Sequence, residues 1–216
     1  MPLKCYRYVL VVSLAMWVLG LMTPAFGQIV NTKSTVIGTD HDIASLGGGC
    51  KSCHTPHQAS AKGGTLLWAP AFSTQTFGVY DSPTLDSKAT EIGDATYSAT
   101  NPPTGSKLHS ILCMSCHDGV TTPSVIGPTD GHAIGNPTNS AGLTNDHPVN
   151  MGYDPGLDTG LTTVAAVTAT NVRLWSEDGP PKVQCSSCHD PHNAPGVDHF
   201  LRRDNAGSAL CTTCHQ

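Results

Sequence analysis

Apolar residues are concentrated in one run near the start of the chain and are scattered thinly after it. The run covers positions 9–22 and follows two basic residues, and small residues at Ala25 and Gly27 come next. Because the run is too short to cross a bilayer comfortably, this pattern predicts a cleaved secretion signal peptide over residues 1–27. A retained N-terminal anchor is the alternative.

The rest of the chain, residues 28–216, has no sustained helical or strand period. Its long intervals, such as 97–107 and 127–142, are rich in Gly, Pro, Thr, Ser and Asn, which interrupt regular structure. Positions 160–175 are more apolar and fit either a short strand or a short helix. Only 12% of the chain is charged, which argues against charge-driven disorder. The pattern predicts one domain of mostly irregular structure with little β.

Every cysteine after position 27 belongs to one repeated motif, Cys-x-x-Cys-His. Cys5 lies in the predicted signal, and the other eight cysteines form four pairs with the same spacing. Cysteines at i and i+3 share one face of a helical turn, so both thiols can reach the two vinyl groups on one edge of a porphyrin. The next histidine can then ligate the iron, and this pattern is typical of c-type haem attachment. The attaching cysteines are Cys50, Cys53, Cys113, Cys116, Cys185, Cys188, Cys211 and Cys214, and the proximal histidines are His54, His117, His189 and His215.

Other uses of paired cysteines fit the sequence less well. Two four-cysteine zinc sites would leave the four adjacent histidines unexplained. A thioredoxin-like redox pair needs a βαβ pattern, which the sequence lacks. A disulfide framework, the default for an exported protein with eight cysteines, explains neither the uniform spacing nor the histidines. The sequence therefore predicts four covalently bound c-type haems (haem c, iron) in one tetrahaem domain over residues 28–216, with short α-helices at the attachment motifs.

Four irons also need four distal ligands, and histidine is in surplus for that role. Seven histidines remain after the proximal ones, whereas Met151 is the one realistic methionine outside the signal and the motifs. Bis-histidine coordination at all four irons is therefore favoured, and it implies lower reduction potentials than histidine–methionine coordination. The seven are His41, His57, His109, His132, His147, His192 and His199.

The choice among these seven rests on their local sequence. His57 and His192 recur at matched positions, three residues after a proximal histidine and directly after a proline. Because Pro56 fixes φ and discourages a continued helix, His57 should ligate the iron of a neighbouring haem, and His192 should do likewise. His41 lies shortly before the first motif, and His147 lies between the second and the third. These four histidines are the predicted distal ligands.

The other three histidines have weaker claims. His109 precedes Cys113 by only four residues and is the reserve ligand. His132 and His199 are the weakest candidates. Any isolated histidine in this chain has the alternative role of a surface residue or a hydrogen-bond donor to a haem propionate.

The chain has few large apolar side chains from which to build a conventional core. Aromatic residues make up 6% of the sequence, and one short domain must cover four porphyrins. Burial of flat rings can replace burial of side chains, and thioether bonds limit the unfolded chain as disulfides do. The predicted fold is therefore that of a multihaem cytochrome c, with loops and short helices wrapped around a stacked haem column.

Several short motifs, in order along the chain, resemble those of the paired Cys-x-x-Cys-His multihaem cytochromes. They are TDHDI, CKSCHTPH followed by LLW, LCMSCHDG, NDHPV, CSSCHDPHN and LCTTCH. Within that family the chain is similar to the OmcE type of exported tetrahaem cytochrome, which polymerises into extracellular nanowires. The resemblance implies a continuous haem chain with stacked and T-shaped pairs, and a distal histidine that the next subunit can donate. It also implies that the distal ligands are His41, His57, His147 and His192.

The function predicted from these features is electron transfer outside the cytoplasm, without catalytic residues or bond chemistry on a substrate. The favoured form is the subunit of a head-to-tail filament, exported through the periplasm to the cell surface or beyond. Its redox partners would be other multihaem cytochromes and extracellular acceptors such as metal oxides. A soluble periplasmic or cell-surface shuttle and a multihaem reductase with one open iron are the alternatives. The net charge of −5 and the lack of a basic cluster argue against nucleic-acid binding, and no transmembrane anchor is predicted in the mature chain.

Overall fold

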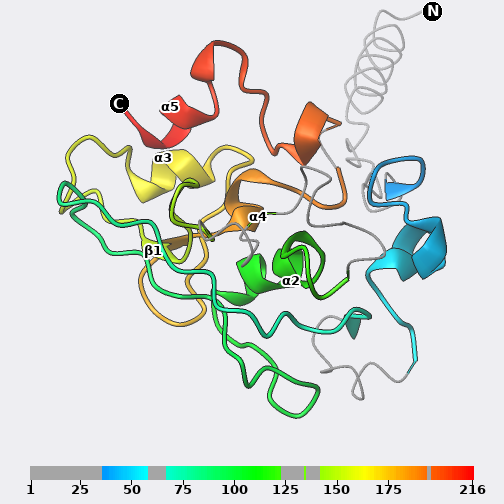
Figure 1. Ribbon diagram of the computed structural model, residues 1–216. Coiled ribbons are helices and arrows are strands. Elements are labelled where there is room, and N and C mark those ends of the chain that lie inside the picture. The colour runs from blue at the N-terminus through cyan, green and yellow to red at the C-terminus, as the bar shows by residue number, and fades with distance from the viewer. Residues whose placement is uncertain (1–35, 58–66, 123–133, 135–141, 194–195) are drawn as a thin grey trace, which may run out of the picture. The chain divides into compact units, whose positions relative to one another are not determined.

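The computed structural model describes residues 36–57, 67–122, 134, 142–193 and 196–216 (Figure 1). These residues belong to one compact unit, Thr32–Gln216. The predicted signal peptide lies outside the described residues and stays a prediction. Within the described ranges, no helix is both long and apolar enough to cross a membrane.

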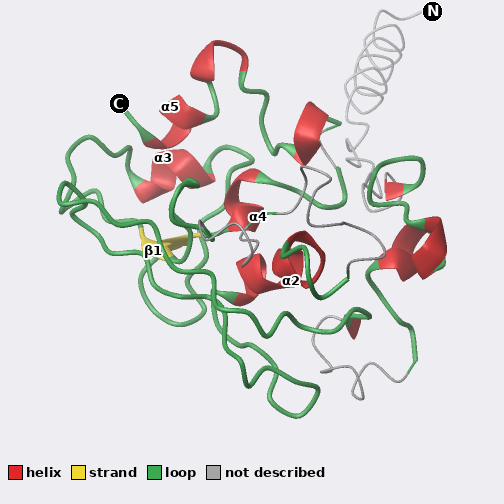
Figure 2. Cartoon of the chain, in the orientation of Figure 1, coloured by secondary structure: helices red, strands yellow, loops and turns green. Residues whose placement is uncertain are grey.

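Most of the described chain is loop, and its regular elements are short (Figure 2). The helices are α2 (Leu108–His117), α3 (Val164–Thr168), α4 (Cys185–Cys188) and α5 (Cys211–Cys214). Single 3₁₀ turns cover Ala44–Leu46, Gly49–Ser52, Asp198–Phe200 and Ala206–Ser208. One antiparallel sheet pairs β1 (Met151–Gly152) with β2 (Lys182–Val183), in the register Met151 to Val183. The predicted fold class, mostly irregular with short helices at the attachment motifs and little β, is confirmed.

All four attachment motifs lie on helical turns. We number them in chain order as motif 1 (Cys50–His54), motif 2 (Cys113–His117), motif 3 (Cys185–His189) and motif 4 (Cys211–His215). Motif 1 starts in a 3₁₀ turn, motif 2 ends α2, and the cysteines of motifs 3 and 4 bound α4 and α5. His189 and His215 directly follow these last two helices and have extended backbone, with ψ of 141° and 134°. Each of the two helices therefore ends where its proximal histidine begins.

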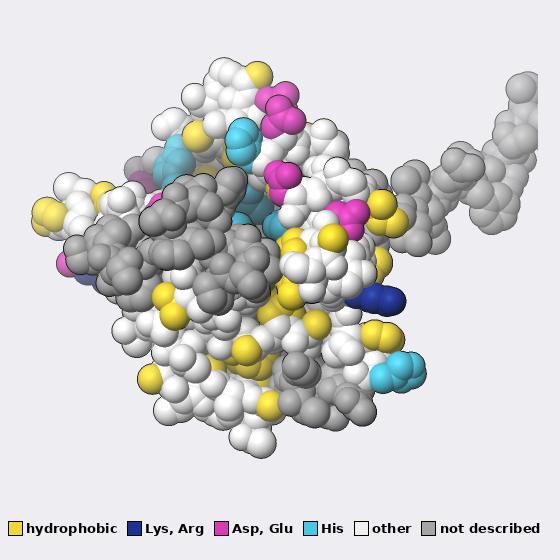
Figure 3. All heavy atoms as spheres, turned by 45° about the vertical axis from the view of Figure 1, so that its right-hand side comes forward, with side chains coloured by type: hydrophobic (Ala, Val, Ile, Leu, Met, Phe, Trp, Pro, Cys, Tyr) yellow, Lys and Arg dark blue, Asp and Glu magenta, His cyan; other side chains and the backbone are white. Residues whose placement is uncertain are grey.

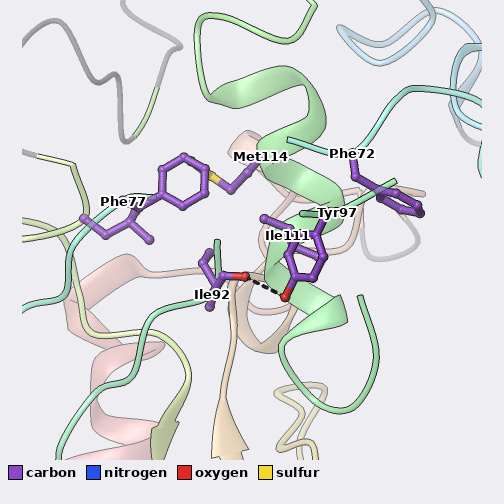
Figure 4. Packing of buried hydrophobic residues seen from close by; sticks show 7 residues of the cluster. Phe72, Phe77, Ile92, Tyr97, Ile111 and Met114 are labelled. Atoms are coloured by element: carbon purple, nitrogen blue, oxygen red, sulfur yellow. Dashed lines mark hydrogen bonds between the residues drawn. The ribbon is translucent and has the colours of Figure 1, made fainter. Parts of the chain in front are cut away.

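The larger hydrophobic cluster packs around α2 (Figure 4). Ile111 and Met114 project from the helix and are almost fully buried. The hydroxyl of Tyr97 donates a hydrogen bond to the carbonyl of Ile92 (3.2 Å), so its polar end is satisfied inside the cluster. Loop residues complete the cluster: Phe72, Phe77, Ile92, Tyr97 and Leu143. The helix that carries motif 2 is thus held by segments that lack regular structure of their own.

A smaller cluster packs beside motif 4. Its buried members are Tyr153, Val167, Val172 and Val183, and Cys214 lies against them. Val167 belongs to α3, where Thr163 accepts the N–H of Ala166 at 3.3 Å as an N-cap. The ambiguous apolar segment at 160–175 therefore contains a short helix, and that helix helps to bury motif 4.

Gly142 lies at a close approach between two loops. Its φ is +53°, and a Cβ added there would lie 1.6 Å from the carbonyl oxygen of Phe77. That oxygen accepts the N–H of Leu143 at 2.9 Å, which fixes the approach. Gly207 has a similar φ of +60°, but no atom lies within 4 Å of its added Cβ. The two glycines thus share a backbone conformation and differ in their surroundings.

Replacing Gly142 with alanine should destabilise the protein much more than the same change at Gly207. Both substitutions carry the left-handed strain of about 1–2 kcal/mol. Only Gly142→Ala must also displace neighbouring backbone, which adds about 1–3 kcal/mol. Chemical denaturation of the two haem-loaded variants measures the difference, and equal free energies of unfolding would contradict it.

Candidate haem-binding sites

A short antiparallel bridge holds the proximal histidine of three motifs. His54 pairs with Trp68, His189 with Leu201, and His215 with Leu161. In each bridge the residue after the histidine donates its backbone N–H to the carbonyl of the residue before the bridge partner. The residue after the bridge partner donates its N–H to the carbonyl of the motif's second cysteine. The two bonds measure 2.7 and 2.8 Å at motif 1, 2.7 and 2.7 Å at motif 3, and 2.9 and 2.8 Å at motif 4. This common geometry fixes the backbone of the histidine and the cysteine together.

Two of these bridges use a strained residue at the same place. Leu67 and Phe200 directly precede the bridge partners of His54 and His189, and their φ values are 58° and 57°. Residues other than glycine rarely adopt this left-handed conformation, and it is concentrated at functional sites. The ring of Phe200 stacks on His41, with ring centroids 4.3 Å apart. The bridge at motif 3 thereby also helps to orient a predicted distal ligand.

Three proximal histidines face a second imidazole at one common distance. Figure 3 shows histidine side chains gathered around a hollow in the upper part of one face. The ring centroids are 6.3 Å apart for His54 and His192, 6.3 Å for His117 and His41, and 6.4 Å for His215 and His147. Three of the four predicted distal histidines therefore lie opposite a proximal histidine.

This distance is the one expected for two imidazoles on opposite sides of a metal ion. A metal–nitrogen bond measures about 2.0 Å, and an imidazole centroid lies about 1.2 Å behind its nitrogen, so imidazoles on opposite sides of a metal ion would have centroids about 6.4 Å apart. Tetrahedral ligands with the same bonds would have centroids about 5.2 Å apart. The three histidine pairs therefore have the spacing of imidazoles that would hold a metal ion from two opposite sides, and their centroids lie further apart than those of tetrahedral ligands.

The three pairs differ in the angle between their rings. The rings of His54 and His192 are parallel within 1°, whereas those of His117 and His41 make an angle of 75°. The rings of His215 and His147 make an angle of 67°. The pairs thus form one parallel and two crossed arrangements, a difference that magnetic spectroscopy of bound iron can detect.

Backbone carbonyls orient several of the candidate ligands through Nδ1. A proton on Nδ1 satisfies such a carbonyl and leaves the Nε2 lone pair available to a metal. The Nδ1–oxygen distances are 3.3 Å from His41 to Pro191, 3.1 Å from His147 to Pro148 and 2.8 Å from His189 to His199. Burial is the largest effect on the pKa of His41 and lowers it, which favours the neutral, ligating form of this imidazole.

The segment directly after motif 3 serves two other motifs. The carbonyl of Pro191 lies beside His41, which faces the proximal histidine of motif 2. The next residue, His192, faces His54 of motif 1, and its Nδ1 lies 3.4 Å from the carboxylate of Asp190. The proline–histidine pair that follows motif 3 therefore contributes to the surroundings of motifs 1 and 2.

The fourth proximal histidine has a different environment. His189 is exposed, and within the described part of the chain no imidazole lies opposite its ring. His57, the fourth predicted distal ligand, is also exposed and lies opposite none of the described proximal histidines. His199 is exposed as well, and its carbonyl lies beside His189 Nδ1. These features leave one predicted ligand and one proximal histidine unmatched within the described residues.

The reserve ligand His109 has partners of another kind. Its ring stacks on Trp175 with centroids 3.4 Å apart, and its Nε2 lies 2.8 Å from a carboxylate oxygen of Glu177. These contacts place it away from the described histidine pairs. His132 lies outside the described residues.

Cysteines of successive motifs lie close together in chain order. Burial and then the nearby Cys116 raise the pKa of the Cys53 thiol to about 11. A hydrogen bond between the Cys113 and Cys185 thiols raises the pKa of Cys113 and lowers that of Cys185. Burial and then Cys214, with a smaller effect of Cys211, raise the pKa of Cys188 to about 11. Hydrogen bonds show the same order: Trp68 beside motif 1 donates to Ser115 of motif 2 (3.3 Å), Cys185 of motif 3 donates its N–H to Ser110 on the motif 2 helix (2.9 Å), and Arg203 beside motif 3 donates to Thr213 of motif 4 (2.9 Å).

The described cysteines and histidines fit covalent haem. The eight described cysteines are free thiols, as thioether formation requires. Among the described residues no group of three or more potential ligands could hold a metal ion. The sites of motifs 1, 2 and 4 offer two imidazoles each, and haem c would supply the iron and its one-electron chemistry there.

Sequence reasoning missed two sets of residues that shape these sites. The first is the bridge partners Trp68, Leu161 and Leu201, which act through backbone hydrogen bonds and leave no fixed residue pattern. The second is a hydroxyl residue at the third position of every motif: Ser52, Ser115, Ser187 and Thr213. The fourfold recurrence of Ser or Thr was a signal in the sequence that could have revealed this second set.

Comparison with known families bears on the last two motifs. Residues 179–216 match the family model described as the doubled CXXCH motif. The C-terminal segment is therefore similar to a paired CxxCH domain. This domain covers less than a fifth of the chain, contains motifs 3 and 4, and supports a multihaem c-type cytochrome with covalently bound haem. No curated protein and no solved structure matches the chain.

Proposed function

We propose that this protein is a tetrahaem c-type cytochrome that carries electrons along four bis-histidine haems, as the subunit of an extracellular filament. The observation that carries the proposal is the adjacency of successive attachment motifs, because haems bound there would follow one another in one series. The paired CxxCH domain supports the multihaem assignment. The haems supply the one-electron redox chemistry, and the chain's own residues attach, orient and insulate them.

The proposed ligand pairs follow the facing imidazoles. The haem of motif 1 takes His54 and His192, that of motif 2 takes His117 and His41, and that of motif 4 takes His215 and His147. The haem of motif 3 takes His189 and, as its distal ligand, His57. The common centroid distances of 6.3 to 6.4 Å support the first three pairs.

The exposure of His189 and His57 supports a junction between copies of the chain. A ligand that one copy offers and an iron that the next copy presents make a heterologous contact, which generates an open filament when its rotation does not close. In this proposal His57 of one subunit ligates the motif 3 haem of the next. Export through the periplasm, the extracellular location and partners such as other cytochromes or metal oxides belong to the same proposal.

The same exposure of His189 favours a second candidate function, a reductase in which the motif 3 iron keeps an open coordination site. A soluble tetrahaem shuttle is a third form, in which His57 ligates an iron within its own chain. These candidates differ in the spin state of one haem and in whether that spin state depends on polymerisation.

Electron paramagnetic resonance at low temperature separates the three. We expect assembled protein to contain only low-spin ferric haem, with a rhombic signal from the parallel pair and more anisotropic signals from the crossed pairs. Dissociated monomers should gain a high-spin signal from one haem in four, because His57 of the neighbour is removed. Negative-stain microscopy on the same samples reports the assembly state.

The control is a His57→Ala variant, which should show the same high-spin signal at any protein concentration and no filaments. High-spin haem in intact filaments would favour the reductase. Monomers with purely low-spin haem and no polymers at high concentration would favour the shuttle and contradict the filament.

A further inference from the structure

Each attachment motif carries a buried hydroxyl between its cysteines. The third position of motifs 1 to 4 is occupied, in that order, by Ser52, Ser115, Ser187 and Thr213. Their exposed fractions are 1%, 0%, 1% and 5%. Since the cysteines at positions one and four share the face toward the haem, the residue at position three lies on the opposite side of the turn. A polar side chain buried there needs a hydrogen-bond partner.

Every one of these hydroxyls accepts a hydrogen bond from outside the span between its cysteines. In motifs 1 and 3 the donor is a backbone N–H, from Ile43 (2.9 Å) and Gln184 (2.9 Å). In motifs 2 and 4 the donor is a side chain, Trp68 Nε1 (3.3 Å) and Arg203 Nη1 (2.9 Å). The hydroxyls of the even-numbered motifs are thus bound by side chains from distant segments.

One side-chain donor belongs to the bridge that holds the preceding motif, and the other lies two residues beyond such a bridge. Trp68 is the bridge partner of His54 in motif 1, and its indole N–H reaches motif 2. Arg203 follows Arg202, whose backbone N–H binds Cys188 and whose Nε binds the carbonyl of Ser186 (2.7 Å) in motif 3. Arg203 itself reaches Thr213 in motif 4. Motif 1 is therefore linked to motif 2, and motif 3 to motif 4, by the same kind of contact.

We propose that the hydroxyl at the third position of each motif is a positioning residue, and that the Trp68–Ser115 and Arg203–Thr213 contacts set the relative orientation of the two haems in each linked pair. The proposal rests on the proposed function in so far as the four motifs carry haem. Alanine or valine at this position of motif 2 or motif 4 would preserve the thioether chemistry, yet the turn would lose its connection to the preceding motif.

The Arg203–Thr213 contact offers the sharper experiment because motif 4 provides its own control. Thr212 neighbours Thr213 but is exposed. Lys88 is an exposed cation that pairs with Asp81 and with no attachment motif. Thr213→Val and Arg203→Gln remove the contact, whereas Thr212→Val and Lys88→Gln remove a hydroxyl and a charge without touching it.

The readout is circular dichroism in the Soret band, where neighbouring haems give a bisignate couplet that depends on their mutual orientation. We expect a loss of couplet amplitude in Thr213→Val and Arg203→Gln, and the wild-type couplet in both control variants. The double variant should lose no more than either single variant, because the two residues act through one contact. Thr213→Ser keeps the hydroxyl and should keep the couplet.

Intact-mass measurement of haem content keeps the outcomes separate. Wild-type protein with four haems and no couplet would contradict the proposed haem series itself. A wild-type couplet that survives in Thr213→Val and Arg203→Gln, even with a lowered unfolding temperature, would overturn the positioning role alone. Equal losses in Thr212→Val and Thr213→Val would overturn it too. If Thr213→Val is not recovered, the exposed Arg203→Gln variant decides.

Discussion

Replacing His192 with methionine should raise the reduction potential of the haem attached at Cys50 and Cys53. The substitution should not change the haem attached at Cys185 and Cys188, although His192 follows that motif directly in sequence. The reason is that the His192 ring faces His54 with centroids 6.3 Å apart, and a thioether ligand raises the potential relative to a second imidazole. We expect a rise greater than about 59 mV, a tenfold change in the reduction equilibrium.

Potentiometric titration followed by optical and magnetic spectra measures this change for one haem in four. His109→Met is the matched control, because the His109 ring stacks on Trp175 and bonds Glu177 instead of facing an imidazole. That variant should leave all four potentials in place. A shift in the motif 3 haem of His192→Met, or in no haem at all, would contradict the assignment.

Protein produced without haem should lack a cooperative unfolding transition. Among the described residues only thirteen hydrophobic side chains are buried, and they are divided between two clusters and a few isolated positions. Their burial must offset the conformational entropy of a chain that is mostly loop, which costs about 1–2 kcal/mol per ordered residue. Buried porphyrin faces and thioether links are therefore needed to stabilise the fold.

Thermal melts followed by far-ultraviolet circular dichroism test this prediction. The sample is residues 28–216 expressed in the cytoplasm, where haem is not attached, and the control is the haem-loaded protein. A sigmoidal transition of the haem-free chain at the temperature of the control would show that side chains alone make the core.

The attachment chemistry could be predicted from the sequence because thioether formation requires cysteines and a histidine at fixed spacing, and the match of residues 179–216 to the doubled CXXCH motif supports it. The sequence also indicated the loop-rich fold, because Gly, Pro and Asn interrupt regular structure wherever they cluster. Which histidine rings face each other across long distances in the sequence was only partly predictable. The proline before His192 indicates a ligand for a neighbouring haem, but it does not say that the neighbour is motif 1, since no local pattern encodes a contact across 138 positions.

The bridges that hold the proximal histidines were not predictable from the residues that form them. The side chains of Leu161 and Leu201 make no hydrogen bonds in these bridges. The hydrogen bonds run between backbone atoms of the neighbouring residues. Many other residues could take either place. The buried hydroxyls differ, since a serine or threonine is needed to accept each bond, and that requirement recurs visibly in all four motifs.

His54 and His192 face each other although they are far apart in the sequence, and this limits where the chain can be cut. A cut anywhere between these residues would separate two imidazoles that face each other, and every such cut would leave motif 1 without its partner ring. Attachment motifs follow one another along the chain, yet the ligands tie the first motif to the third. A polymer of this protein would therefore lengthen by whole chains rather than by single haems, and its smallest conducting unit would be the complete domain.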